Sequence, residues 1–390
     1  MTASIEPYRV EVPETVLEDL RERLHRTRWP DQLPDVGWEP GAELGAVREL
    51  CTYWAHGFDW RAVEARLNAS EQFITESHGE RLHFLHVRSP EPGALPLVLT
   101  HGWPGSVVEF LDVIGPLADP VAHGGEAADA FHVVVPSIPG YGFSGPTRHP
   151  GFHAGTMAEV VKELMADLGY DRYGAQGGDW GSEVTRRLGR IDVEHVAGIH
   201  VNMMIVGPPA EGAFDGLTEA ELAALGEGAE MAETGIGYLQ LQSTKPQTLA
   251  YGLTDSPAGL AAWLLEKFHA WTDHGPDEVS ALSDDQMLAD ITTYWVTGTA
   301  NSAARLYWES ARARTSAMDS AGEGGGPGYI DVPTGYAAYP GELIRPPRSW
   351  IEATCNLVHV VEMPRGGHFA AWEQPDLFVD DLRTFFRKVR

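Results

Sequence analysis

The amino-acid sequence predicts an α/β fold: a mostly parallel sheet with helices on both faces, an inserted helical lid and an N-terminal arm. From Pro96 onward, short apolar runs alternate with helical patterns, which is typical of a parallel sheet covered on both faces. The alternation stops near Pro208, where a mainly helical stretch begins, and it resumes after the glycine-rich segment GEGGGPG. The helical stretch is therefore expected to be an insertion within the sheet-forming region.

The overall composition limits the partners of the chain. Its 390 residues can bury a sizeable core, and the 28 basic and 56 acidic residues give a formal net charge of −28. This charge disfavours nucleic acid and anionic membranes as partners. No apolar run resembles a signal peptide or the roughly 20 residues of a membrane-spanning helix, and Cys51 and Cys355 lack CxxC spacing. We expect a soluble cytoplasmic protein, and a homodimer is compatible with the sequence.

Residues 1–75 are expected to form the arm. Apolar residues recur every three or four positions in VLEDLRERL, which predicts a helix that ends at the prolines of TRWPDQLPD. A second helix is predicted within residues 41–60. The alternating stretches FITES and RLHFLHV flank His78 and Gly79, a pattern that predicts a β-hairpin.

Residues 76–207 and 329–390 are expected to form the two parts of the core. The predicted strands of the first part end in HGWPGS, IPGYGFSG, GGDWGS and a loop that begins at Asn202. Between them, TMAEVVKELMADLGY predicts a helix with Thr156 and Glu159 as a capping box. Loops at the carboxyl ends of parallel strands hold the functional site in such sheets, so the site is expected among these loops.

Residues 208–328 are expected to form the lid, with the glycines near its end as a flexible return to the core. The lid is rich in large aromatic side chains, which suggests an apolar pocket, although lid helices also need a core of their own. These aromatics are Trp263, Phe268, Trp271, Trp295 and Trp308.

The stretch GGDWGS places Asp179 at the tip of a predicted strand-to-helix turn. Small residues flank such a tip because the turn is strained and packs closely on its strand and helix. An aspartate there can also simply cap the helix that follows, and short motifs of this kind recur by chance. As a nucleophile, the carboxylate would form an ester with an electrophilic carbon, and water must then cleave that ester.

Cleavage of an ester needs a base, and His368 is the histidine best placed to supply it. It lies in the glycine-flanked loop MPRGGHF after the last predicted strand. His359 lies within that strand and is expected to be a packing residue.

An acid must orient the ring of the base. Glu342 follows the predicted strand VPTGYAA in the loop YPGE, at the right end of the sheet, although this assignment depends on position alone. Asn202 cannot ionise, Asp331 begins its strand, and Glu352 falls within a helix. The predicted set therefore follows the chain order Asp179, Glu342, His368.

Two backbone N–H groups are expected to bind the oxyanion that develops during ester cleavage. The turn at Asp179 supplies the N–H of Trp180, and the loop HGWPGS supplies that of Trp103. The same loop can be a rigid turn around a packed tryptophan, and both roles are compatible because the donor is main chain.

Together these segments resemble the epoxide hydrolases of the α/β-hydrolase fold, most closely their microsomal-type branch, almost from end to end. VEVPETVLEDLRERLHRTRWPD resembles the arm of that branch, which wraps the core. HGWPGS, GGDWGS, YPGE and RGGHFAAWEQP resemble its oxyanion, nucleophile, acid and base loops. Membrane-bound relatives carry an N-terminal anchor helix that this sequence lacks, which favours the soluble bacterial members.

The resemblance implies a reaction without metal or organic cofactor. In this family two lid tyrosines donate hydrogen bonds to the epoxide oxygen, and the matching stretches GYLQLQSTKP and ARLYWES give Tyr238 and Tyr307. Asp179 would attack an epoxide carbon, and His368 would activate the water that releases a vicinal diol. Without the resemblance, both tyrosines would be interpreted as packed helix residues.

Two other functions share parts of this pattern. Haloalkane dehalogenases use the same aspartate and histidine, and Trp180 could bind a halide, but a leaving halide has no need of phenols. A non-catalytic binder of the same fold need not keep a complete acid–base set. The sequence leaves open the physiological epoxide, the attacked carbon, the stereochemistry, and the choice between detoxification and secondary metabolism.

Overall fold

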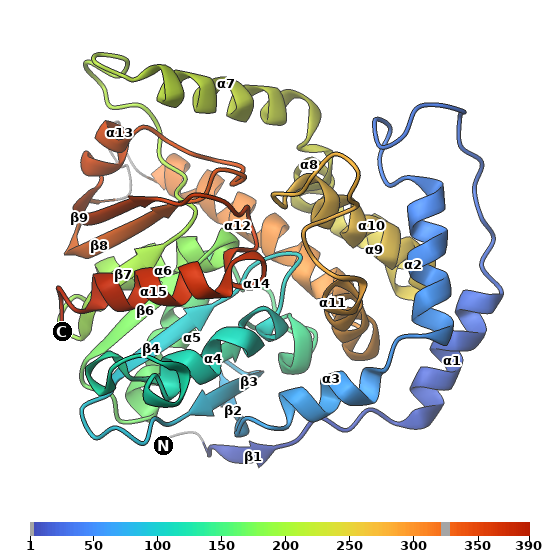
Figure 1. Ribbon diagram of the computed structural model, residues 1–390, viewed down its shortest axis with the longest axis horizontal. Coiled ribbons are helices and arrows are strands. Elements are labelled where there is room, and N and C mark those ends of the chain that lie inside the picture. The colour runs from blue at the N-terminus through green and yellow to red at the C-terminus, as the bar shows by residue number, and fades with distance from the viewer. Residues whose placement is uncertain (1–3, 321–327) are drawn as a thin grey trace.

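A nine-stranded sheet forms the framework of the core and lies to one side of the molecule, away from the helices of the arm (Figure 1). The computed structural model describes residues 4–320 and 328–390. In chain order, the strands are β1 (Glu6–Tyr8), β2 (Gln72–Ser77), β3 (Glu80–Val87), β4 (Leu95–Thr100), β5 (Phe131–Ser137), β6 (Tyr173–Gly177), β7 (Val196–Val201), β8 (Ile330–Ala338) and β9 (Cys355–Glu362). Their order across the sheet is β1-β2-β3-β5-β4-β6-β7-β8-β9.

The sheet is antiparallel from β1 to β5 and parallel from β5 through β4 and β6 to β9. Strands buried on both faces consist of nearly continuous apolar runs, and the buried segments FHVVVPS of β5 and VAGIHV of β7 follow this pattern. The predicted fold class, a mostly parallel sheet with helices, is confirmed.

Helices cover both faces of the sheet. Helices α4 (Leu111–Ala118) and α15 (Pro375–Phe386) pack together on one face, and α5 (Ala154–Asp167) and α6 (Asp179–Ile191) pack together on the other (Figure 1). The short helices α13 (Arg348–Glu352) and α14 (Ala370–Glu373) complete the core.

The lid lies between β7 and β8 in the chain. Its helices are α7 (Glu219–Thr234), α8 (Gly237–Thr244), α9 (Pro246–Asp255), α10 (Pro257–Ala270), α11 (Asp284–Thr297) and α12 (Ala300–Ser320). The predicted glycine-rich return loop falls mostly on residues 321–327, which lie outside the described residues.

The arm contains α1 (Glu14–His25), α2 (Leu44–His56) and α3 (Trp60–Leu67). Helices α1 and α2 match the two predicted helices, whereas α3 was not predicted. Beside pairing β1 with β2, the arm lies along the lid, where α1 and α2 pack against α10 (Figure 1). The Tyr53 hydroxyl donates to Asp285 over 2.8 Å, and Trp38 stacks on His269 with ring centroids 3.8 Å apart. The arm therefore braces the lid.

Two local predictions have different outcomes. The hairpin is confirmed, because His78 and Gly79 join β2 to β3 with positive φ angles of 53° and 78°. The capping box at Thr156 is wrong. Helix α5 begins earlier, and the ring of His153 accepts the N-terminal hydrogen bonds, while the Thr156 hydroxyl donates to the carbonyl of Gly151.

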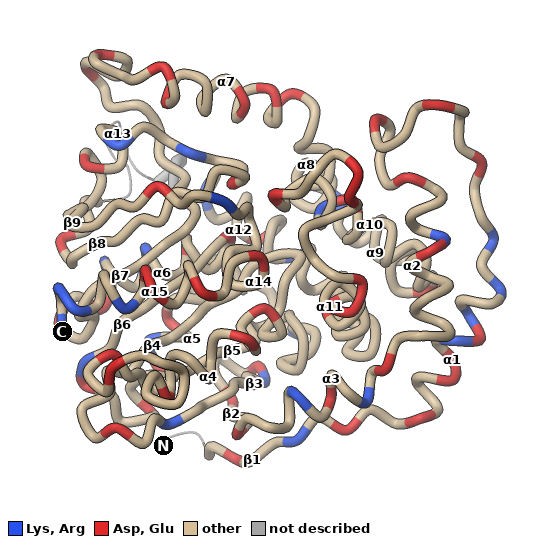
Figure 2. The backbone as a smooth tube through the Cα atoms, in the orientation of Figure 1, with Lys and Arg blue, Asp and Glu red and all other residues tan. Residues whose placement is uncertain are grey.

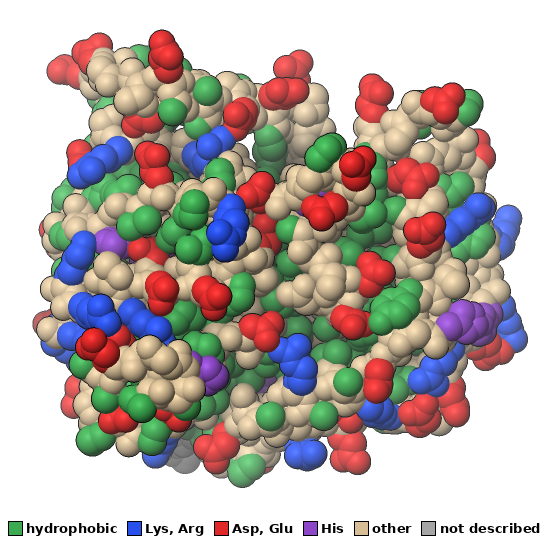
Figure 3. Space-filling model, viewed as in Figure 1, with side chains coloured by type: hydrophobic (Ala, Val, Ile, Leu, Met, Phe, Trp, Pro, Cys, Tyr) green, Lys and Arg blue, Asp and Glu red, His purple; other side chains and the backbone are tan. Residues whose placement is uncertain are grey.

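Acidic residues are spread over the whole chain rather than gathered in one region. Figure 2 shows them on the arm, along α7 and on the loops of the core, and Figure 3 shows acidic side chains dispersed over the face in view. Among the described residues, no helix is both long and apolar enough to cross a membrane.

Candidate active site

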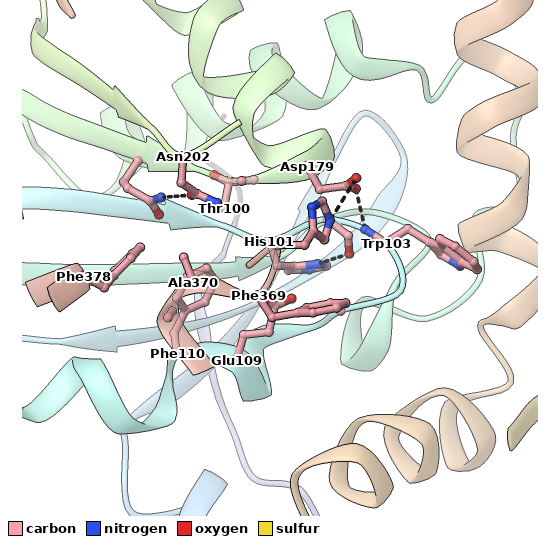
Figure 4. Close-up of a pocket in the computed structure, with 16 residues that line it drawn as sticks. Thr100, His101, Trp103, Glu109, Phe110, Asp179, Asn202, Phe369, Ala370 and Phe378 are labelled. Atoms are coloured by element: carbon pink, nitrogen blue, oxygen red, sulfur yellow. Dashed lines mark hydrogen bonds and ion pairs between the residues drawn. The ribbon is translucent and has the colours of Figure 1, made fainter. Parts of the chain in front are cut away.

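Asp179 occupies a strained turn between β6 and α6. Its φ angle is 48°, in the left-handed region that non-glycine residues seldom adopt. The alternative that Asp179 caps the helix is wrong, because Gly178 is the N-cap residue and no side-chain cap is present. The turn instead directs the carboxylate away from the helix, toward the loop that follows β4 (Figure 4).

The small residues of GGDWGS are required by close packing. A methyl group on Gly177 would lie 2.1 Å from the carbonyl oxygen of Gly181, and one on Gly181 would lie 1.8 Å from the carbonyl oxygen of Thr100. Both approaches are far shorter than van der Waals contact, so the turn can form only with glycine at these two positions.

His368 and Glu342 converge on Asp179 from two loops at the carboxyl ends of strands. The Nδ1 atom of His368 lies 2.8 Å from Oε1 of Glu342, and its Nε2 lies 3.5 Å from Oδ2 of Asp179. The side chains of His368 and Glu342 are 2% and 0% exposed, while that of Asp179 is 15% exposed. The structure therefore brings the three predicted residues together, with His368 between Glu342 and Asp179 and with Asp179 the most accessible of the three.

The two carboxylates control the charge of the imidazole. Burial alone would lower the pKa of His368, but the charges of Glu342 and Asp179 and their hydrogen bonds outweigh it and hold this pKa well above its ordinary value. The ring therefore carries a proton as long as both carboxylates are ionised.

The loop after β4 supplies a backbone donor to the same carboxylate. The N–H of Trp103 donates to Oδ1 of Asp179 over 2.7 Å (Figure 4). A methyl group on Gly102 would lie 2.2 Å from that oxygen, so glycine is needed for the approach. His101 is occupied structurally, with Nδ1 paired to the carbonyl of Gly102 and Nε2 accepting from the N–H of Ile138, and burial lowers its pKa to about 4.

The lid places two tyrosines above this loop. Tyr238, from α8, stacks on Trp103 with ring centroids 5.1 Å apart and planes 7° from parallel, and Tyr307, from α12, meets the ring of Trp180 edge-on at 4.9 Å. The two tyrosine rings are 6.0 Å apart. Among the described residues, the buried Tyr307 hydroxyl has no hydrogen-bond partner.

Both phenols remain protonated in this environment. Burial, and after it the charge of Asp179, raises the pKa of Tyr238 and the pKa of Tyr307 well above the ordinary value. Each hydroxyl therefore has a proton to donate at any physiological pH.

Of the lid aromatics picked out in the sequence, Trp271 packs directly against the site. Its ring centroid lies 5.0 Å from that of His368 and 5.1 Å from that of Tyr238. Phe268 packs behind it against Phe369. Trp295 and Trp308 lie under the guanidinium groups of Arg23 and Arg312, so aromatic content alone did not locate the pocket.

Glu373 holds the loop that carries His368, a role that the sequence did not indicate. Its carboxylate accepts the N–H groups of Gly367, Phe369 and Asp273 at 2.8 to 2.9 Å, and the N–H of His368 itself donates to the carbonyl of Trp271. The segment HFAAWEQP could have indicated this role, because Glu373 lies five residues after His368. These hydrogen bonds join the core loop that carries His368 to the lid at Trp271 and Asp273, directly beside the imidazole.

Comparisons with known proteins show the family of this chain. A family model described as "Epoxide hydrolase N terminus" matches residues 5–110, and one described as "alpha/beta hydrolase fold" matches residues 96–215. The chain is 46% identical over 387 residues to a protein of Stigmatella aurantiaca with an epoxide hydrolase name, a match that covers 99% of this chain and 86% of that protein. The chain belongs to the epoxide hydrolase family. It is also 36% identical to "Epoxide hydrolase 1" of Sus scrofa over 98% of this chain and 88% of that protein.

Solved structures agree with this membership of the epoxide hydrolase family. The epoxide hydrolase of Aspergillus niger matches with a TM-score of 0.88 and 33% identity, over 100% of this chain and 97% of that chain. The juvenile hormone epoxide hydrolase of Bombyx mori also matches with a TM-score of 0.88, at 32% identity, over 100% and 95% of the two chains. A haloalkane dehalogenase variant from Bradyrhizobium elkanii reaches a TM-score of 0.55 at 15% identity, which shows a common fold alone. The predicted family and enzyme class are confirmed.

Proposed function

We propose that the seven residues predicted from the sequence carry out epoxide hydrolysis in two steps. In the first, an Asp179 oxygen attacks an epoxide carbon and the ring C–O bond breaks. The hydroxyls of Tyr238 and Tyr307 hold the epoxide oxygen, and one of them protonates it as the ring opens. The product of this step is a hydroxyalkyl ester of Asp179.

In the second step, water cleaves the ester at its acyl carbon. Ester formation removes the negative charge from Asp179, so the pKa of His368 falls. The ring gives up its proton, which restores the phenol that protonated the epoxide oxygen, and it can then accept a proton from water. Glu342 orients the ring and stabilises its positive charge. The backbone N–H groups of Trp103 and Trp180 bind the oxyanion, and collapse releases the diol, whose oxygen takes the proton from His368. The proton left on the Asp179 carboxyl group returns to His368 and restores the resting ion pair.

One observation carries this proposal: the carboxylate of Asp179 lies between the N–H of Trp103 and the imidazole of His368, with Glu342 behind the ring. A binder of the same fold has no need of this complete set. The presence of two buried phenols beside the acid–base pair also favours an epoxide over a haloalkane. The alkoxide formed when an epoxide opens requires a proton, whereas the halide that leaves a haloalkane does not.

The aromatic surroundings favour an apolar or aromatic epoxide. Trp103, Trp180, Trp271 and the two tyrosines form a set of rings in mutual contact around the nucleophile. Such surfaces pack well against apolar rings and chains. Cytoplasmic location and a homodimer remain predictions.

Product analysis with a panel of epoxides and bromoalkanes tests the proposed function. We expect a vicinal diol from at least one alkyl or aryl epoxide and no halide release from the bromoalkanes. Asp179→Asn should abolish diol formation while the variant stays folded. Halide release without diol formation, or full activity of the variant, would overturn the proposal.

A further inference from the structure

A small cavity lies beside the nucleophile and the base, and one carboxyl group in its wall has no part in the mechanism above. The cavity is lined by Asp179, His368, Glu109 and Phe369, among others (Figure 4). It offers about 20 Å³ to the centre of a water molecule. A single water needs roughly 10–15 Å³ by this measure and two to four polar partners, so the space suits one water or little more.

The position of this cavity matches the second step of the reaction. A water that attacks the ester must lie within reach of both the acyl carbon at Asp179 and the base at His368, and both residues line this space. Water held by the imidazole alone would be free to rotate and shift. A second acceptor fixes its direction of attack, and well-oriented attack contributes substantially to catalysis.

Glu109 is placed to be that second acceptor. It lies in the short 3₁₀ helix Val107–Phe110, directly after the loop that supplies the Trp103 donor. The electrostatic field at its carboxyl group includes contributions from both His368 and Asp179. Of the other polar side chains of the wall, His101 has both ring nitrogens paired and the Gln176 amide N–H donates to Asn202. The Thr100 hydroxyl and the Gln176 carbonyl oxygen have no partner among the described residues, but neither is a carboxyl group close in the chain to the Trp103 donor.

The preceding loop leaves room for this carboxyl group. A methyl group on Gly105 would lie 1.5 Å from Oε1 of Glu109. The φ angle of Gly105 is outside the positive range, so no turn requires glycine there. The missing side chain at position 105 is therefore explained by the space that the Glu109 carboxyl group occupies.

The carboxyl group is suited to bind water without competing with the reacting groups. Burial, and after it the nearby Asp290, raises the pKa of Glu109 well above its ordinary value. A raised pKa favours the neutral form, and in that form the group adds no negative charge next to Asp179 and does not take the proton from His368. Its carbonyl oxygen can still accept a hydrogen bond from water.

We propose that Glu109 binds the hydrolytic water together with His368 and directs it at the acyl carbon of the Asp179 ester. This inference rests on the proposed function and assigns a further residue to its second step. In that step one water proton passes to Nε2 of His368, the other is held by the Glu109 carbonyl oxygen, and the water oxygen bonds to the acyl carbon. The carbon–oxygen bond to the diol then breaks, and the diol oxygen receives the proton from His368.

Rapid-quench kinetics on two matched variants tests this role, with styrene oxide or whichever epoxide of the panel the parent converts fastest. Intact mass measures formation and decay of the ester separately. We expect Glu109→Leu, which fills the same space without an acceptor, to form the ester within twofold of the parental rate and to hydrolyse it at least tenfold more slowly. Glu109→Gln keeps a carbonyl oxygen in place, and its hydrolysis rate should stay within about threefold of the parent.

The outcomes separate this inference from the proposed function. Parental hydrolysis in Glu109→Leu, or equal slowing of both steps, would overturn the role of Glu109 while the ester mechanism stands. If the parent itself forms no ester, the proposed function fails and this inference fails with it. Should Glu109→Leu not fold, Glu109→Ala also lacks the acceptor and must show the same selective loss of the second step.

Discussion

The side chains of Asp179 and His368 form a largely buried ion pair, with Nε2 of the imidazole 3.5 Å from Oδ2 of the carboxylate. The pair couples the two steps of the proposed reaction. While Asp179 is ionised, its charge helps to keep His368 protonated, and esterification of Asp179 removes that charge. In the proposed reaction, formation of the Asp179 ester therefore helps to convert His368 from a protonated ring into a base.

The first prediction concerns this coupling. Replacement of Asp179 by Asn imitates the uncharged ester, so the pKa of His368 should fall relative to the parent. The shift can be followed by NMR titration of the ring carbons, with His368→Gln used to assign the signal among sixteen histidines. An unchanged titration would show that Asp179 has no control over the base.

A second prediction concerns the two lid phenols. Tyr238→Phe and Tyr307→Phe should each slow ester formation by about 10- to 100-fold, since general-acid assistance contributes about 10²–10⁴ in total. Ester hydrolysis should be unchanged, because the phenols act on the epoxide oxygen. Tyr173→Phe is a matched control, since that buried hydroxyl donates to Asp192 away from the site. Equal slowing of both steps would instead indicate a packing role for the two phenols.

A third prediction concerns the turn that presents the nucleophile. Gly181→Ala brings a methyl group to 1.8 Å from the carbonyl oxygen of Thr100, and we expect a loss of at least about 3 kcal/mol in unfolding free energy. Gly226→Ala, in the interior of α7 with nothing within 4 Å, should instead be neutral or stabilising by up to about 1 kcal/mol. Urea denaturation compares the two, and a stable Gly181→Ala would contradict the close packing.

A fourth prediction concerns Asp290, which is fully buried in α11 and has no hydrogen-bond partner for either oxygen among the described residues. Burial raises its pKa to about 8. Because the folded value exceeds the unfolded one, the stability linked to this group is present at low pH and is lost as pH rises toward and through 8. Asp290→Asn cannot ionise, so its Tm relative to the parent should rise by about 2 °C or more between pH 6 and pH 9. A constant difference would contradict a buried, neutral carboxyl group.

The sequence could propose Asp179, Glu342 and His368 as one set because their positions follow from topology. Parallel strands deliver their carboxyl ends to one edge, so a nucleophile after β6, an acid after β8 and a base after β9 converge once the strands are assigned. Asp331 and Glu352 could be set aside by the same reasoning. The topology of the sheet places no such constraint on Tyr238 and Tyr307 in the lid. They were proposed only from the family resemblance.

Other features depended on tertiary contacts that no local pattern encodes. Thr156 and Glu159 matched a capping box, yet α5 begins earlier because His153 supplies the cap. The arm's contact with the lid depends on pairs such as Tyr53 and Asp285, which lie 232 residues apart in the chain. Nothing in the local sequence distinguishes Glu109 from an ordinary surface residue of a helix. The position of its carboxyl group, in the space that a side chain at Gly105 would occupy, is visible only in the structure.

Intact mass spectrometry of His368→Gln, incubated with an epoxide that the parent converts, tests the covalent mechanism most directly. We predict an adduct equal to the mass of the epoxide, located on Asp179 by peptide mapping and lost when Asp179→Asn is added. No adduct under these conditions, or an adduct that persists in the double variant, would contradict ester formation at position 179.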